Sequence, residues 1–362
     1  MDLMILDASF APLGVVDAFI SLQWTRRYYE VGSFELHTDM AWYDLLRQGR
    51  YVYRNDAVEV GVIEGLSYEQ GETEEQLTVS GRFLECLLER RVIPQRMELA
   101  GTAEQICRTL VDQMAIHPQE PARAIPKLAL GAEKGLGTET TCQCGGETLL
   151  EKLQELCQSQ ELSFALRYDY ENDEMLFEVW QGKDRTQGQK ENGWAVFSRG
   201  QENLLTSDYS VDEQDYRNFA YVVGEAEQGQ TPVCVTVDRT NGRDRRELYV
   251  DASSVKREVD GETMTDEAYR QALWQKGLEA LDGYRRVEAY NHAIDPNANL
   301  MYKTHYDLGD ICTVIQEKIG LVAEKRIEEV REAVEADGLA VEMTFGEDYV
   351  SLGKAIKREV KA

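Results

Sequence analysis

Aromatic, basic and polar side chains alternate along a stretch near the start of the chain, at residues 21–29. Successive side chains of a β-strand point to opposite faces of a sheet. One face of this strand would carry Leu22, Trp24, Arg26 and Tyr28, and the other Gln23, Thr25, Arg27 and Tyr29. Gly32 and Ser33 then supply a turn into a return strand at 34–37. The pattern predicts a segment that builds a sheet and not a reaction centre.

Further strand-like runs complete a first β-rich unit, which we place at residues 1–99. They lie at 51–53, 57–63 and 76–80, with a spacing typical of an antiparallel barrel or sandwich. A short apolar run at 83–88 and Pro94 close the unit.

The hydrophobic period changes after this unit. From Ala103 to Met114 apolar residues recur at intervals of three and four, which predicts an amphipathic helix capped by Thr102. A second helix is expected at 148–159, followed by a hairpin with strands at 163–168 and 175–180. We therefore predict an α+β domain at 100–182, and the polar segment 183–193 reads as a linker.

The remaining residues, 194–362, are expected to form a second β-rich domain. Its predicted strands lie at 194–198, 207–211, 219–224, 233–238, 287–291, 311–316, 321–334 and 339–345. A helical insertion is predicted near 262–283, and Asn241-Gly242 indicates a hairpin turn. The predicted fold class is α+β, mainly β.

Charge limits the partners of a chain of 362 residues, which is long enough for two or three domains. The 66 acidic and 39 basic residues give a formal net charge of −27, which argues against a nucleic-acid-binding surface and against binding to an anionic membrane. No apolar run is long enough for a membrane span, and the first residues lack the basic region of a secretory signal. We expect synthesis in the cytoplasm, with no direct membrane span.

The sequence lacks three common motifs of catalysis and of nucleotide or metal binding. It contains no Walker-type loop, no Gly-x-Ser-x-Gly elbow and no His-Glu-x-x-His. The seven cysteines are expected to be reduced, and Cys142, Cys144 and Cys157 lack the spacing of a zinc site. His305 with Asp307 and Asp310 could form a metal or general-base group, but a tight turn leading into the next strand is the favoured interpretation. We expect no catalytic, metal or cofactor site and no enzyme.

Taken together, several segments resemble a siphovirus-type phage tail protein family of baseplate-hub and tail-tip proteins. They are residues 21–36, 179–186, 218–225, 306–314 and 341–346, which span nearly the whole chain. The resemblance implies two tube-like β-barrel units with the α+β domain between them. It transfers no catalytic residue.

The resemblance further implies a structural hub protomer, a homotrimer at the virion tail tip of a phage made in the host bacterial cytoplasm. This hub would close the distal end of the tail tube and help the passage of DNA or effectors. If part of the acidic charge lines its channel, carboxylates would repel DNA phosphates. Expected partners are distal tail, tail tube and tape-measure proteins, with receptor-binding or lysin proteins on separate chains.

Two alternatives stay open: a tail-tip enzyme that degrades the cell wall, and a hexameric tail tube or adaptor subunit. The candidate contact residues for any assembly are Trp24, Arg26, Arg27 and Tyr28, because aromatic residues and arginine are enriched at interfaces. For Trp24, packing in the core is the other possible role.

Overall fold

Strands dominate the computed structural model, which describes residues 1–71, 75–206, 208–226, 231–259, 262–294, 298–336 and 338–346. The helices are α1 (Tyr43–Gln48), α2 (Ala103–Val111), α3 (Leu149–Ser159) and α4 (Asp266–Asp282), with short helical turns η1 (Met40–Trp42), η2 (Leu84–Arg90), η3 (Asp112–Ile116), η4 (Pro121–Arg123), η5 (Arg199–Gln201) and η6 (Glu317–Ile319). The strands are β1 (Leu3–Leu6), β2 (Pro12–Val16), β3 (Ser21–Arg27), β4 (Ser33–Thr38), β5 (Tyr51–Arg54), β6 (Val60–Gln70), β7 (Glu75–Phe83), β8 (Met97–Thr102), β9 (Leu128–Leu130), β10 (Glu139–Cys144), β11 (Ser163–Asp169), β12 (Glu174–Trp180), β13 (Val196–Phe197), β14 (Asp208–Asp212), β15 (Phe219–Val223), β16 (Cys234–Asp238), β17 (Glu247–Asp251), β18 (Glu258–Val259), β19 (Glu262–Thr263), β20 (Val287–Ile294), β21 (Ile311–Gln316), β22 (Leu321–Glu335) and β23 (Gly338–Phe345).

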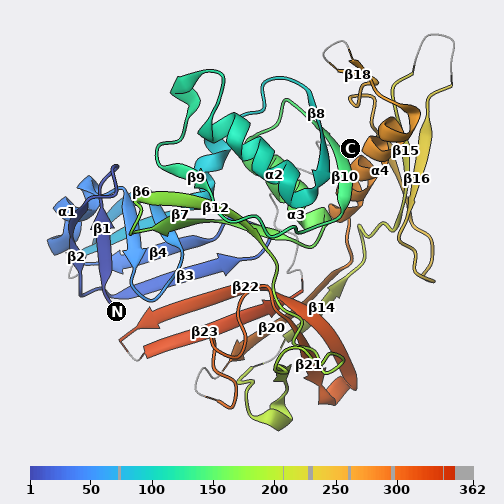
Figure 1. The fold of residues 1–362 in the computed structure, drawn as a ribbon. Helices are drawn as coiled ribbons and strands as arrows, with labels where there is room; N and C mark the ends of the chain where they lie inside the picture. Colours follow the sequence, from blue (N-terminus) through green and yellow to red (C-terminus); the bar gives the residue numbers. More distant parts are fainter. Residues whose placement is uncertain are drawn as a thin grey trace.

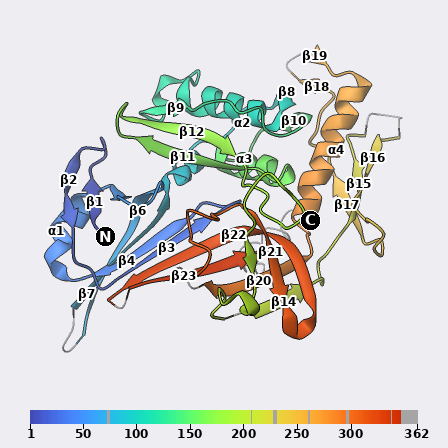
Figure 2. The ribbon, with the colours of Figure 1, turned by 60° about the horizontal axis from the view of Figure 1, so that its bottom comes forward.

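One sheet joins the two ends of the chain. Its strand order is β14-β20-β23-β22-β3-β4-β7-β6-β5-β1-β2, and β21 with β13 continues from the first half of β22. The central contact is between β3 and β22, which pair antiparallel from Arg27 opposite Glu329 to Leu22 opposite Val334. We call this pairing the seam. Figures 1 and 2 show the blue N-terminal strands and the orange-red C-terminal strands side by side along it.

The mainly β, α+β class is confirmed, but the two barrel units are not. Among the described residues the sheet runs from β2 to β14 without closing on itself. The reason lies at the seam, because the edge that β3 would need to close its own unit pairs with β22. The domain boundaries stay a prediction, and residues 347–362 of the last predicted domain lie outside the described part.

The alternation in the opening stretch is confirmed. The four residues predicted to share one face, Leu22, Trp24, Arg26 and Tyr28, are all buried. Trp24 packs against Phe34 and Phe83 in the core of the N-terminal strands. The burial of these large side chains fixes the register of β3, since a slip by one residue would turn them to solvent.

The helices and the hairpin that the sequence predicts for the α+β region are present in the structure. Thr102 and Thr148 begin α2 and α3 with capping boxes, in which each threonine accepts a hydrogen bond from the third helical residue. The hairpin β11–β12 forms as predicted, and β9 extends it in parallel. In Figures 1 and 2 these helices and strands lie on one side of the large sheet.

The prediction of a hairpin at Asn241-Gly242 is wrong. Both residues have the positive φ angles that the turn requires. However, β16 and β17, the strands that the turn connects, do not pair, because β15 lies between them. This small sheet covers α4 through Val222, Val237 and Leu273.

A buried carboxyl group joins the N-terminal strands to the α+β region. Glu85 of η2 accepts a hydrogen bond from the Leu166 amide of β11 at 3.0 Å. Its side chain is almost fully buried, and this burial raises the pKa of Glu85 from an ordinary value near 4.5 to about 7.

We expect this group to make stability depend on pH. Because the folded-state pKa is raised, the folded protein holds a proton between about pH 4.5 and 7 that the unfolded chain has lost, so stability falls as pH rises through this window. The loss amounts to at most roughly 3 kcal/mol. Urea unfolding at pH 5 and pH 8 should show a smaller difference for Glu85→Gln than for the wild type. An unchanged difference would contradict this role of Glu85.

The seam also contains a buried ion pair. Arg54 of β5 and Glu332 of β22 are fully buried and lie 2.5 Å apart, and Lys303 lies 3.0 Å from the same carboxylate. The Arg54 guanidinium also lies over the Trp24 ring. Asp56 also lies 2.8 Å from the Arg54 guanidinium, so removal of Glu332 would leave Arg54 and Lys303 with one carboxylate fewer in a buried site.

We expect Glu332→Gln to lower the free energy of unfolding by about 3 kcal/mol. Glu342→Gln is the matched control, because Glu342 lies on the exposed side of neighbouring β23, 3.7 Å from Arg331, and should cost less than about 1 kcal/mol. The double variant Arg54→Met/Glu332→Leu should recover much of the loss, since apolar side chains can replace a buried pair. Urea unfolding measures all three, and equal losses for Glu332→Gln and Glu342→Gln would argue against the pair.

Candidate functional site

A polar groove crosses the seam on the face of the sheet opposite Trp24. Its volume is about 660 Å³. Its lining comes from β3, β4, β6, β7 and β22 and consists of Gln23, Thr25, Arg27, Ser33, Phe34, Glu35, Glu64, Gly65, Ser80, Gly81, Arg82, Glu329 and Arg331. Both ends of the chain therefore build one surface, which we call the seam groove.

The charges of the seam groove compensate one another. Arg27 binds Glu329 across the seam at 2.7 Å. Arg82 binds Glu64 at 2.8 Å, and Arg331 donates to the Gln23 side chain at 2.7 Å. Although the whole chain is strongly acidic, its excess negative charge is thus not concentrated in this groove.

The structure places the four candidate contact residues on both faces of β3 and just beyond it. Trp24 and Tyr28 are at most 1 % exposed, so within the single chain they serve the core. Arg27 reaches the seam groove and is partly exposed. Contact of any of the four with a partner chain stays a prediction.

Arg26 connects the N-terminal strands with a loop before β21. Its guanidinium binds Glu59 at 2.7 Å, Asp307 at 2.6 Å and the Tyr302 hydroxyl at 2.7 Å. These carboxylates and the phenol hold the pKa of Arg26 well above its usual range, against the opposing effect of burial. The seam is thus held by charged groups on its buried face as well as by backbone pairing.

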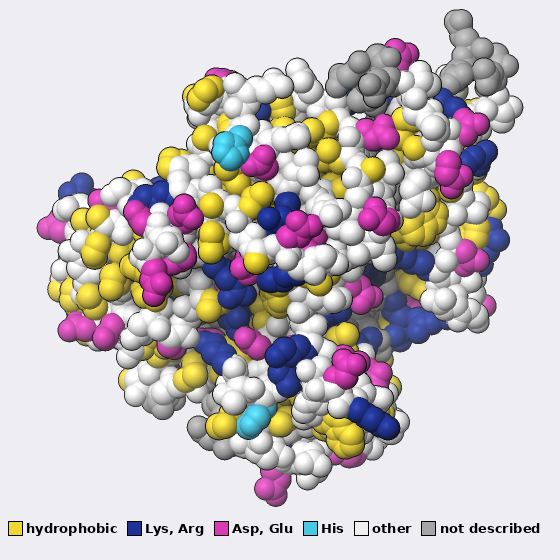
Figure 3. Space-filling view, in the orientation of Figure 1, with side chains coloured by type: hydrophobic (Ala, Val, Ile, Leu, Met, Phe, Trp, Pro, Cys, Tyr) yellow, Lys and Arg dark blue, Asp and Glu magenta, His cyan; other side chains and the backbone are white. Residues whose placement is uncertain are grey.

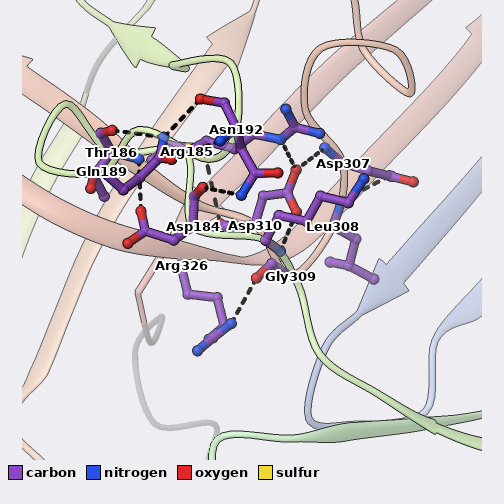
Figure 4. A network of polar contacts seen from close by, with 12 residues as sticks. Asp184, Arg185, Thr186, Gln189, Asn192, Asp307, Leu308, Gly309, Asp310 and Arg326 are labelled. Carbon is purple, nitrogen blue, oxygen red and sulfur yellow. Dashed lines mark hydrogen bonds and ion pairs between the residues drawn. The ribbon is translucent and has the colours of Figure 1, made fainter. Parts of the chain in front are cut away.

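Asp310 anchors the predicted linker to the C-terminal strands (Figure 4). Its carboxylate accepts hydrogen bonds from the Lys183 amide at 2.7 Å and from Arg185 Nε at 2.5 Å. The backbone of the linker then follows β21, since the Arg185 amide donates to the Ile311 carbonyl. Figure 4 also shows Asn192 bound to the Asp184 carbonyl, which folds the linker back on itself.

Two glycines allow the start of the linker to pack closely against the turn before β21. A Cβ atom on Gly182 would lie 1.9 Å from the Gly309 carbonyl oxygen. Gly309 has a φ of +85°, and a Cβ there would collide with Tyr28 and Trp180. The predicted turn at Leu308-Gly309-Asp310, which leads into β21, is confirmed, and packing requires glycine at its centre.

Lys and Arg side chains gather between the α+β region and the C-terminal strands. On the face in Figure 3, Lys and Arg form a band between the upper α+β region and the lower C-terminal strands. Arg326 of β22 binds Glu161 at 3.2 Å, and Arg285 donates to the Gln158 carbonyl at 3.1 Å. Arginine thus links the C-terminal strands to the α3–β11 connection.

The groups considered for metal or acid–base chemistry do not converge on one site. The Nδ1 atom of His305 accepts a hydrogen bond from the Met301 amide at 2.9 Å, whereas Asp310 faces Arg185. The described residues hold no cluster of three or more His, Cys, Asp or Glu suited to a metal ion. Within the same ranges, no helix is both long enough and apolar enough to cross a membrane.

Sequence reasoning did not find Arg54, Glu332 or the role of Asp310. For Arg54 and Glu332, however, the sequence contains a sign that the charge is buried. Arg54 lies two positions after Val52, and Glu332 lies two positions from both Val330 and Val334. Each charge therefore occupies the apolar face of its strand. A charge at such a position indicates a buried partner, but the sequence does not say which.

We expect Asp310→Asn to loosen the linker without unfolding the sheet. The amide would accept the Arg185 hydrogen bond only weakly and would lose the charge, so backbone amides of 183–195 should exchange with deuterium at least about tenfold faster. Asp215→Asn, at an exposed carboxylate, is the control and should leave exchange in this segment unchanged. Equal protection in wild type and Asp310→Asn would contradict the anchoring role.

Three solved structures that share this fold are tail proteins, two of them from prophages. The chain is 16 % identical to the tail protein from Neisseria meningitidis MC58, with a TM-score of 0.59 and 96 % of each chain covered. It is 14 % identical to the 43 kDa tail protein of prophage MuSo2 from Shewanella oneidensis, with a TM-score of 0.59 and coverage of 96 % and 98 %. For the prophage tail protein gp18 from Listeria monocytogenes EGD-e the values are 12 %, 0.58, 100 % and 99 %.

These identities establish a shared fold. No curated protein matches the sequence. The family model of siphovirus ReqiPepy6 Gp37-like proteins, however, matches residues 2–347. The resemblance to a siphovirus tail family is thereby confirmed, and the chain belongs to the siphovirus ReqiPepy6 Gp37-like protein family of phage tail proteins.

Proposed function

We propose that this phage tail protein is a protomer of a trimeric hub that closes the distal end of the tail tube. The observation that carries the proposal is the seam. It joins two four-stranded sheets, β3-β4-β7-β6 and β22-β23-β20-β14, into one wall of eight strands. Three copies would contribute six such sheets, which is the number that a sixfold tube presents.

The ends of this wall suit pairing between copies. From β6 to β14 every neighbouring pair is antiparallel, so the two end strands run in opposite directions, as β3 and β22 do at the seam. In β6, only Val60–Val62 pairs with β5, and among the described residues no strand covers the same edge of Glu64–Gln70. The outer edge of β14 is likewise unpaired by any described strand. Unpaired edges are templates for another strand.

Side chains at these two edges support the same arrangement. Leu66 and Tyr68 of β6 and Val211 of β14 are exposed apolar residues in the single chain. Pairing of β6 in one copy with β14 in the next would cover them and close a ring in which every seam is antiparallel.

In such a ring the seam groove would face the channel, because the α+β region and the N-terminal core lie on the other side of the sheet. Its compensated Arg and Glu side chains would present few free charges to DNA. This differs from the acidic, phosphate-repelling channel suggested by the net charge, and it favours a hydrated wall without strong attraction in either direction.

The proposed partners are those of a tail tip: the distal tail, tail tube and tape-measure proteins, and receptor-binding or lysin proteins on other chains. The role is structural and not enzymatic. Membership of a family of tail proteins and the fold shared with other tail proteins support it.

Electron microscopy of purified tails tests the proposal. We expect a ring of three copies at the distal end, with DNA or effector passage through its centre. A ring of six copies, or copies along the tube, would identify a tube or adaptor subunit instead. Cell-wall degradation by the purified chain in a zymogram would favour the tail-tip enzyme.

Variants of exposed residues on β6 and β14 test the proposed contact between copies. We expect Tyr68→Lys and Val211→Lys each to weaken ring formation at least about tenfold, because a lysine at a buried strand edge must be desolvated. Tyr249→Lys is the control, since Tyr249 is exposed on β17, away from both edges. The fraction of tails that carry the hub in micrographs gives the measure, and an equal loss with all three variants would contradict the proposed contact.

A further inference from the structure

Four buried thiols lie in the core of the α+β region. Cys107 is on α2, Cys157 is on α3, and Cys142 and Cys144 are on β10. The sulfur atoms of Cys107 and Cys157 are 3.7 Å apart, which is van der Waals contact. These two residues are 50 positions apart in the sequence and come from two helices that pack face to face.

The thiols of Cys142 and Cys144 are also hydrogen-bonded to each other, and the two contacting pairs differ in their suitability for a disulfide. A disulfide requires a sulfur–sulfur distance of about 2.05 Å and Cα atoms roughly 4.4–6.8 Å apart. Cys142 and Cys144 are two residues apart on one extended strand, which holds their Cα atoms at roughly 6.5–6.8 Å, the upper limit. Cys107 and Cys157 lie on separate helices, which can approach by a side-chain rotation and a small shift.

We propose that Cys107 and Cys157 form a dithiol site that a low-molecular-weight disulfide, such as oxidised glutathione, converts into a disulfide joining α2 to α3. One protein thiol loses its proton and attacks a sulfur of the oxidant, which releases one glutathione thiol. The second protein thiol then loses its proton and attacks the mixed disulfide, which releases the second glutathione. The two cysteines are oxidised, glutathione disulfide is reduced to two thiols, and both protons pass to the products.

The surroundings of the pair set when this reaction occurs. Contact with Cys157 and burial hold the pKa of Cys107 well above its usual range, so the thiolate forms only when the helices open or the pH is high. In the reducing cytoplasm the pair stays as thiols, whereas a tail released from the host meets oxidising conditions. The disulfide would then close a long loop and stabilise the α+β region.

The test is oxidation of the full chain carrying Cys234→Ser, which removes the exposed thiol that could link two molecules. The protein is incubated with oxidised glutathione at pH 8.5, unfolded with alkylating agent present, and digested for mass spectrometry. We expect a peptide pair joined through Cys107 and Cys157, lighter by two hydrogen atoms. The apparent Tm should rise by about 5 °C or more and should return on reduction with dithiothreitol.

Matched variants separate this site from the other buried thiols. Cys107→Ser should abolish the rise in Tm, whereas Cys86→Ser, at another buried cysteine, should retain it. Peptide mapping of the parent protein needs no further variant and therefore decides the outcome even if Cys107→Ser fails to fold. Recovery of Cys107 and Cys157 as alkylated thiols after prolonged oxidation, or a disulfide between Cys142 and Cys144 instead, would overturn the proposal.

Discussion

The antiparallel pairing of β3 with β22 holds the N-terminal and C-terminal strands in one sheet. It brings together strands about 300 residues apart, and the buried pair of Arg54 with Glu332 lies beside it. Burial of two charges is expensive unless they are paired, so this contact is available only when both ends of the chain are in register. The ion pair therefore makes the seam specific as well as stable.

At the seam, the two faces of the sheet differ in character. On one face, Trp24 and its neighbours pack into the core, and Arg26 reaches across to Asp307. On the other face, Arg27 and Glu329 meet in the polar seam groove. A single strand thus contributes both to the core and to the surface that the proposed ring would turn toward its channel.

A shared apolar core attaches the α+β region to this wall, since Leu6, Phe10 and Val62 pack in one cluster with residues of α2, α3 and β12, and polar contacts add to it. Asp310 holds the linker, Arg326 and Arg285 bind the α3–β11 connection, and Glu85 accepts a hydrogen bond from β11. Contacts of this kind respond to pH and to single substitutions.

The local elements could be read from the amino-acid order alone: the alternation that buries Trp24, the threonine caps of α2 and α3, the helix of the insertion near 262–283, and the turn at Gly309. Each depends on residues within a few positions of one another. Three other features became known from the folded chain: β3 pairs with β22, β15 separates β16 from β17, and Arg54 meets Glu332. Strand partners and buried ion pairs join residues far apart in the chain, and alternation within one strand specifies its faces but not its neighbour.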